Sequence, residues 1–290
     1  MKGYLAYRKG ILQILQNKIR SNGIDIPAGS WHGETRDTYT HILPLADESN
    51  TRCSRVKAIK EYLGILIDEN FLPTKSKGRG ETLHPYSHHL NSSQLLCYSA
   101  FRGLLNEDHT PKEAFINLLW GLGIVISRNA RCDFEFSDGL KWENGGEMEG
   151  TTFDFHIFDN DKEYFFEIKF TENGFGKAAK DDRHLQKIKD IYLNRIAGIT
   201  DNTLSEEDCI QYYQLIRNII RADSESKTVI FITDANNPST NNDISCFCNK
   251  FLTKSITKPL FWTWQEICAR WPADIEKPFQ FVCFEDTASV

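Results

Sequence analysis

The sequence predicts an α/β fold in which a mixed sheet is flanked by helices, and three patterns support this prediction. Apolar and polar residues alternate within 131–137, 151–158 and 163–170, as expected of strands with two different faces. The run 227–233 is apolar throughout, which is typical of a strand buried on both faces. Apolar residues recur at helical spacing over 4–20. The chain therefore contains both strand and helix patterns, and a sheet that is buried on both faces needs helices on each side.

Helices are expected before, between and after these strands, because caps and helical spacing recur along the chain. We predict them at 4–20, at 54–68, after a cap at Ser92, from Thr110 and Pro111 to about Gly123, and near 180–198, 205–222 and 242–252. A mixed segment follows at 260–271, and a short strand is expected at 279–284. We divide the chain into a helical N-terminal extension over 1–85, which we associate with substrate recognition, and a core domain over 86–290. Alternatively, both parts form one compact unit.

Composition and charge limit the classes of function. The chain has 290 residues, of which 40% are hydrophobic and 12% aromatic, so it encodes a packed protein. With 34 Lys and Arg against 40 Asp and Glu, the net charge is −6. This balance excludes a protein coated in basic patches, so nucleic-acid binding requires a local group of cations. No run approaches the roughly 18 apolar residues of a membrane span, and we expect a cytoplasmic protein without a membrane partner.

The cysteines and histidines do not form a recognisable metal-binding pattern. The eight cysteines are scattered, which fits a reducing compartment, and we expect most of them to be buried thiols. They are Cys53, Cys97, Cys132, Cys209, Cys246, Cys248, Cys268 and Cys283. The cluster of His84, His88 and His89 is an alternative metal site, although the same residues fit a loop that leads into a helix.

A hairpin at 152–170 carries the most informative polar residues. If Asn160 and Asp161 are the central residues of its turn, Asp154 stands directly opposite Glu167. Alternation also places Phe153 and Phe155 together on the face away from Asp154, and Lys169 on the face of Glu167. Two carboxylates about 5 Å apart repel by roughly 3 kcal/mol at an effective dielectric constant near 20. A positive charge is therefore expected between them.

A divalent cation would supply that charge. Carboxylate oxygens suit Mg²⁺, with Mn²⁺ as a substitute, and the main-chain carbonyl of Ile168 could add a further ligand beside Asp154 and Glu167. With the Lys169 ammonium next to the ion, such a site can activate water and stabilise negative charge that develops on a phosphate.

The same residues resemble the signature of the PD-(D/E)xK nuclease superfamily. Asp154 is followed after twelve residues by Glu167-Ile168-Lys169, and the segments 91–101 and 150–155 look like those of a bacterial group of predicted restriction endonucleases. The resemblance covers most of 85–235, with Phe153 in place of the usual proline. It implies a restriction-endonuclease-like αβββαβ core and a Mg²⁺-dependent DNA endonuclease of bacterial restriction or phage defence. Asp154 and Glu167 would bind the metal, and Lys169 would orient the attacking water.

The resemblance also suggests secondary site residues. A further acid often joins such a site, and of Glu113 and Glu135 we favour Glu135. Gln214 resembles a glutamine that lines related active sites. For DNA binding we predict the cations that follow the motif, namely Lys177, Lys180, Arg183 and Lys187.

The sequence and the family resemblance predict some of the partners and only part of the substrate preference. DNA is the expected partner, a homodimer is expected if cutting is two-fold symmetric, and the defence setting implies a partner methyltransferase or defence protein. The alternative is a catalytically inactive nuclease fold that binds nucleic acid or protein. The sequence does not choose between DNA and RNA, between single and double strands, or among recognition sequences and methylation states.

Overall fold

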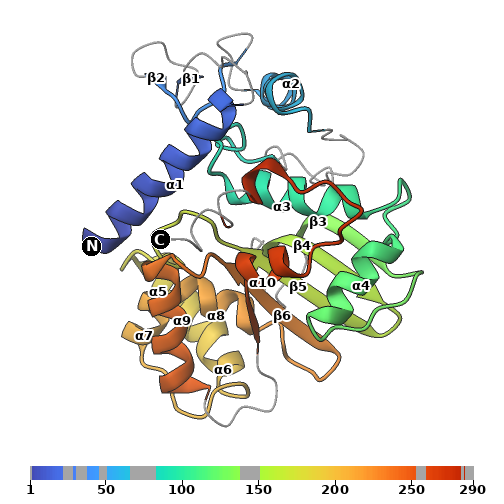
Figure 1. Ribbon diagram of the computed structural model, residues 1–290. Helices are drawn as coiled ribbons and strands as arrows, with labels where there is room; N and C mark the ends of the chain where they lie inside the picture. Colours follow the sequence, from blue (N-terminus) through green and yellow to red (C-terminus); the bar gives the residue numbers. More distant parts are fainter. Residues whose placement is uncertain are drawn as a thin grey trace.

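A five-stranded sheet forms the centre of the protein (Figure 1). The computed structural model describes residues 2–21, 29–30, 38–45, 51–65, 83–137, 151–252, 259–281 and 284. The strands are β3 (Arg131–Ser137), β4 (Thr152–Asp159), β5 (Lys162–Ile168), β6 (Lys227–Thr233) and β7 (Leu260–Thr263), in that spatial order. β3, β4 and β5 pair antiparallel, whereas β6 and β7 continue the sheet in parallel. The predicted α/β class and mixed sheet are confirmed.

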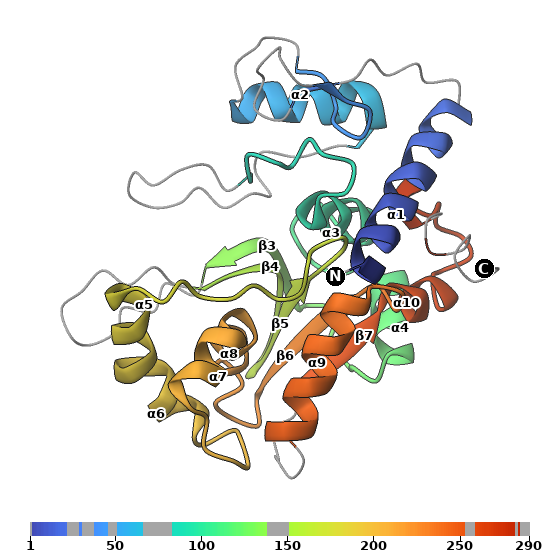
Figure 2. The same ribbon diagram turned by 90° about the vertical axis from the view of Figure 1, so that its left-hand side faces the viewer.

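Helices cover both faces of the sheet and enclose two hydrophobic clusters (Figure 2). The first cluster includes side chains of α1 (Lys2–Ser21), α2 (Arg52–Leu63), α3 (Ser93–Phe101), α4 (Glu113–Gly121) and α10 (Trp264–Ala269). The second cluster includes side chains of α6 (Leu193–Ile196), α7 (Glu206–Gln211), α8 (Tyr213–Ile219) and α9 (Pro238–Phe251), with α5 (Asp182–Lys187) joined to α6 by a π-helical turn, Ile188–Tyr192. A small second sheet pairs β1 (Gly29–Ser30) with β2 (Thr38–Tyr39), and 3₁₀ turns lie at Arg102–Leu104 and Phe279–Phe281.

Several helix ends follow directly from the sequence. α3 starts after Ser92, whose hydroxyl accepts a hydrogen bond from the main-chain N–H of Leu95, as predicted. The helix predicted over 54–68 is wrong at its end, because α2 stops at Leu63, where Gly64 adopts a left-handed conformation with φ of 65°. α9 begins four residues earlier than predicted, because Asn237 caps it and Pro238 occupies its first turn.

Three further predicted elements differ in the structure. Thr110 and Pro111 do not start α4. Thr110 instead donates to the carboxylate of Asp108 in a tight turn, and the helix begins at Glu113. The helix predicted over 205–222 is two helices that meet at Tyr212, where the backbone leaves helical geometry. The strand predicted at 279–284 is wrong at its start, because 279–281 form a 3₁₀ turn, and 282–283 lie outside the described residues.

The hairpin register is as predicted. Phe155 pairs with Phe166, and Asp159 pairs with Lys162 across the turn. The two-residue connection requires left-handed backbone, which Asn160 supplies with φ of 56°. Local turn chemistry and alternation therefore set the pairing of β4 with β5.

Helix α1 is fixed to the end of strand β5. Its apolar side chains Ile11 and Leu15 are buried in the first cluster. The Tyr4 hydroxyl donates to the carbonyl of Thr171 at 2.8 Å. The Tyr7 hydroxyl lies 3.0 Å from the carbonyl oxygen of Phe170 and 2.7 Å from Asp234 Oδ2. The N-terminal helix therefore supports the backbone that directly follows Lys169.

We expect Tyr7→Phe to lower the free energy of unfolding by about 1 to 2 kcal/mol, because a hydroxyl bonded to a buried carboxylate is lost. Urea unfolding followed by circular dichroism measures the change. Tyr62→Phe is the matched control, since the Tyr62 ring packs on the same cluster. Within the described part of the chain, its hydroxyl makes no hydrogen bond. Equal losses in the two variants would show that these hydrogen bonds do not hold α1.

Other sequence predictions have mixed outcomes. Cys97, Cys132 and Cys209 are buried, but Cys53 and Cys246 are exposed, and none of these five is in a disulfide. In the described part of the chain, no helix combines the length and apolar character needed to cross a bilayer. The division at residue 85 stays a prediction.

Candidate active site

The candidate site lies where three strands meet at one edge of the sheet. β5 ends at Ile168 and the parallel β6 ends at Thr233, while the antiparallel β4 begins at Thr152. Asp154, Glu167 and Lys169 are therefore brought to the same edge. In α/β sheets this edge, at the carboxyl ends of parallel strands, is the usual place for a ligand.

Glu167 and Lys169 form a buried ion pair. Lys169 Nζ lies 2.9 Å from Glu167 Oε1, and the two residues are 8% and 5% exposed. Gln214 of α8 donates to the same carboxylate oxygen at 2.7 Å, so the structure brings this predicted residue to the motif. Burial acts to lower the pKa of Lys169, but the charges of Glu167 and Glu172 outweigh it and raise that pKa. Lys169 is therefore an ammonium at neutral pH.

Asp154 is held next to the pair by the backbone of β5. The Ile168 N–H donates to Asp154 Oδ2 at 2.7 Å. Burial raises the pKa of Asp154 well above its usual value of 3.8, and the nearby charges of Glu167 and Glu135 raise it further. These like charges are close enough to repel in a buried place, as expected of a site that accepts a cation.

In the strands that carry Glu135 and Asp154, the regular alternation of side chains between the two faces of the sheet is interrupted at these residues. Phe134 pairs with Phe155 and packs in the first cluster, whereas Phe136 pairs with Phe153, which packs in the second cluster. Between the pairs, Glu135 has left-handed backbone with φ of 49°, a strained conformation for a residue with a side chain. The predicted grouping of Phe153 with Phe155 on one face is therefore wrong.

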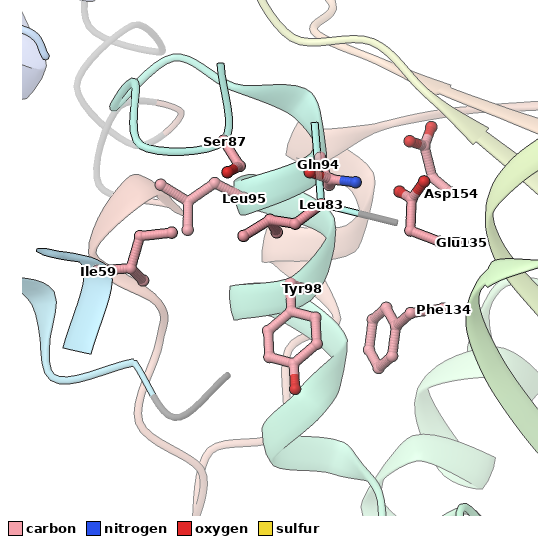
Figure 3. A pocket seen from close by; sticks show the side chains of 9 residues that line it. All are labelled: Ile59, Leu83, Ser87, Gln94, Leu95, Tyr98, Phe134, Glu135 and Asp154. Atoms are coloured by element: carbon pink, nitrogen blue, oxygen red, sulfur yellow. The ribbon is translucent and has the colours of Figure 1, made fainter. Parts of the chain in front are cut away.

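This change of face directs both acids toward α3. Figure 3 shows the carboxylates of Glu135 and Asp154 pointing into the same space, with the Gln94 amide directed toward them. Glu113, the other candidate for a further acid, instead pairs with Arg128 at 2.9 Å on the exposed surface. Of the two, Glu135 lies at the site. Gln94 was not predicted as a site residue, although it lies within the 91–101 segment that carried the family resemblance.

An open cleft of about 720 Å³ leads to Glu135 and Asp154, and helix α1 lies along one side of it. It lies between α1, the segment before α3 and the beginning of β4. The described residues that line it are Tyr4, Arg8, His84, Pro85, Tyr86, His89, Asn91, Ser92, Ser93, Gln94, Glu135, Thr152, Asp154, Thr171 and Glu172. A substrate can therefore reach Asp154 and Glu135 without any movement of the strands.

The predicted DNA-binding cations are absent from the described lining of this cleft. Arg183 and Lys187 lie in α5, at the other end of this edge from α1 in Figure 2. Lys177 instead follows Phe175 and Gly176, which lie beside Lys169 and Gln214. Lys180 pairs with Glu207 at 2.6 Å. The role of these cations in DNA binding stays a prediction.

The histidine cluster does not form a metal centre. His88 is fully buried and packs edge-on against His89, with ring centroids 4.7 Å apart. His84 Nδ1 accepts a hydrogen bond from the Tyr86 N–H. Within the described ranges, no three His, Cys, Asp or Glu side chains are arranged to hold a metal ion. Because this finding covers acidic side chains as well, the metal ligands expected from the sequence, namely Asp154, Glu167 and the main-chain carbonyl of Ile168, stay a prediction.

A comparison with protein families gives a match over most of the chain. Residues 66–281, more than half of the chain, match the family described as restriction endonuclease associating with ARP. The chain belongs to this family. No curated protein and no solved structure shows significant similarity to it.

Membership of this restriction endonuclease family indicates a restriction-endonuclease-like function. The matched range contains Gln94, Glu135, Asp154, Lys169 and Gln214, which the structure gathers around one edge of the sheet. Helix α1 lies outside the matched range, although it forms one wall of the cleft.

Proposed function

We propose that the protein is a metal-dependent endonuclease that hydrolyses DNA phosphodiester bonds, in bacterial restriction or phage defence. The observation that carries this proposal is the buried Lys169–Glu167 pair with Asp154 fixed beside it by the Ile168 N–H. The order α4, β3, β4, β5, helices, β6 fits the restriction-endonuclease-like αβββαβ core. The family match supports the same reading.

The residues present fit a hard divalent cation. Glu167 is buried and Asp154 is half-buried beside the cleft. Loss of hydration raises the pKa of Asp154, the charge of Glu167 raises it further, and a cation between the two carboxylates would relieve their repulsion. Asp154, Glu167 and the Ile168 carbonyl would hold Mg²⁺ or Mn²⁺. When bound, the ion supplies Lewis-acid chemistry, which makes a bound water more acidic and offsets negative charge on the phosphate.

The chain's own groups would position the reactants. Because Lys169 stays protonated, its ammonium acts as a hydrogen-bond donor that orients the attacking water or the scissile phosphate. Gln214 fixes the carboxylate of Glu167 from α8, and the Ile168 N–H fixes that of Asp154. Glu135 would add negative charge near the water and accept a proton from it.

Cleavage assays test the proposal directly. Plasmid DNA, single-stranded DNA and RNA are incubated with Mg²⁺, with Mn²⁺ or with EDTA. We expect the protein to cut DNA with Mg²⁺ or Mn²⁺ and not to cut it in EDTA. Should Asp154→Ala and Lys169→Ala cut as fast as the parent, the proposed site is wrong. A parent that binds nucleic acid without cutting under any condition would favour the inactive, binding form of the fold.

Glu135→Gln is expected to slow cleavage about 10- to 100-fold, because it removes a charge that faces Asp154 in the site. Glu113→Gln is the matched control, since this acid is exposed and bonded to Arg128 away from the cleft. Initial rates on one plasmid substrate compare the two. Similar rates for both variants would exclude Glu135 from the chemistry.

The family description also bears on partners. It names an association with ARP, which agrees with our proposal that the enzyme works with a partner defence protein or methyltransferase. DNA is the proposed substrate, and a homodimer would allow two-fold symmetric cutting. Light scattering of the protein with and without a cognate DNA duplex measures the oligomeric state.

A further inference from the structure

The cleft beside the candidate site has one cationic wall. Among its described lining residues, Arg8 of α1 is the one Lys or Arg. Its charge acts on two neighbouring groups. Burial lowers the pKa of His41 to about 4 with a further contribution from Arg8, and burial raises the pKa of Tyr4 although Arg8 opposes that shift. The acids Glu135, Asp154 and Glu172 lie along the same cleft. Those carboxylates repel phosphate unless a metal is bound. We therefore expect Arg8 to bind a phosphate of the substrate other than the scissile one.

The segment before α3 adds a surface of neighbouring rings. The His84 and Tyr86 rings have centroids 4.8 Å apart, and those of Tyr86 and His89 are 5.3 Å apart. Burial and the charge of Arg55 lower the pKa of His84, so its imidazole is neutral at pH 7. A neutral ring does not bind phosphate as a cation. It offers a face on which a base can stack.

We propose that this cleft holds one unstacked nucleotide of the substrate strand, with its phosphate on Arg8 and its base against the rings of His84 and Tyr86. The inference rests on the proposed nuclease function and adds the form of the substrate. A cleft of about 720 Å³ lies within the range of roughly 300–1,000 Å³ that is usual for sites of small-molecule size. It holds a nucleotide released from the helical stack, and its rings offer faces that only an unstacked base can use. Helix α1 thus gives this chain a binding element outside the family's matched range.

Binding of labelled oligonucleotides tests the phosphate contact. Fluorescence anisotropy in a background of Asp154→Asn, which prevents cutting and removes one of the carboxylates that repel phosphate, gives Kd for a single strand and for a blunt duplex of the same sequence. We expect Arg8→Gln to weaken binding of the single strand about tenfold and to reduce the slope of log Kd against log salt by about 0.7, because one phosphate contact is lost. Lys9→Gln is the control, since Lys9 carries the same charge on an exposed position of the same helix. Equal Kd and slope for the two variants would overturn the proposal.

A second variant tests the base contact. Tyr86→Ala should weaken single-strand binding about tenfold with an unchanged salt slope, because stacking does not involve counterions. Circular dichroism and thermal unfolding confirm that each variant is folded. If the duplex binds as tightly as the single strand and Tyr86→Ala changes neither, no unstacked nucleotide is held.

These outcomes separate the inference from the function on which it rests. If the protein with Asp154 intact cuts DNA, and Arg8→Gln cuts and binds like Lys9→Gln, only the inference fails. If that protein neither cuts nor binds any nucleic acid, the proposed function fails as well.

Discussion

Asp154→Asn is expected to lower the rate of DNA cleavage about a thousandfold and, at the same time, to stabilise the metal-free protein. The rate falls because the amide has lost the charge that a divalent cation needs, and single electrostatic groups of this kind contribute about 10²- to 10³-fold. The stability rises because loss of hydration, and then the charges of Glu167 and Glu135, oppose the ionised form of Asp154. The amide oxygen can still accept the hydrogen bond from the Ile168 N–H.

Initial cleavage rates and thermal unfolding in EDTA measure the two effects on one preparation. Asp161→Asn is the matched control, because it makes the same chemical change at an exposed position of the same hairpin turn. It should alter neither the rate nor the melting temperature appreciably. A variant Asp154→Asn that is slow but also less stable than the parent would mean that Asp154 is structural and its charge is already compensated.

Magnesium is expected to stabilise the parent protein. A ligand that binds only the folded state at ten times its Kd adds about 1.4 kcal/mol to the free energy of unfolding, which corresponds to roughly 2 to 3 °C in Tm for a chain of this size. Asp154→Asn should show no such shift. Thermal unfolding with MgCl₂ or EDTA at constant ionic strength measures it, and an equal shift in both proteins would place the metal elsewhere.

The pH dependence of the metal-free protein has a definite sign. Since the pKa of Asp154 is raised above 3.8 in the folded state, the folded protein binds more protons than the unfolded chain between pH 3.8 and that raised value. The free energy of unfolding therefore decreases as pH rises through this window, and Asp154→Asn should flatten the curve. The raised pKa of Lys169 acts only above its usual 10.5, so it does not mask the effect. Urea unfolding in EDTA from pH 4 to 8 compares the two proteins.

The register of the β4–β5 hairpin could be predicted from neighbouring residues alone. The turn at Asn160 and Asp161, together with the alternation of β4 and β5, was sufficient to predict that Phe155 pairs with Phe166. Turn geometry and side-chain period are properties of neighbouring residues, so the sequence carries them directly. The same rules predicted the cap at Ser92.

The reversal of faces at Glu135 and Asp154 was not predictable in this way. Alternation places Phe153 with Phe155, but the left-handed backbone at Glu135 separates them into different clusters. That conformation is strained for a residue with a side chain, so it persists only because packing on both faces of the sheet requires it. No local pattern in the sequence reports such packing.

The sequence by itself determined the α/β class, the hairpin and the association of Asp154, Glu167 and Lys169 with one motif, because periodicity, turns and short spacings are local. Only the tertiary structure decided which distant residues join them. It placed Glu135, which the family resemblance favoured, at the site and Glu113 on the exposed surface, and it brought Gln214, which the resemblance also suggested, to Glu167. It also placed Gln94 and Arg8 of α1, which the sequence analysis did not name as site residues, on the cleft. These contacts join segments far apart in the chain, and the burial of apolar surface between the layers brings those segments together.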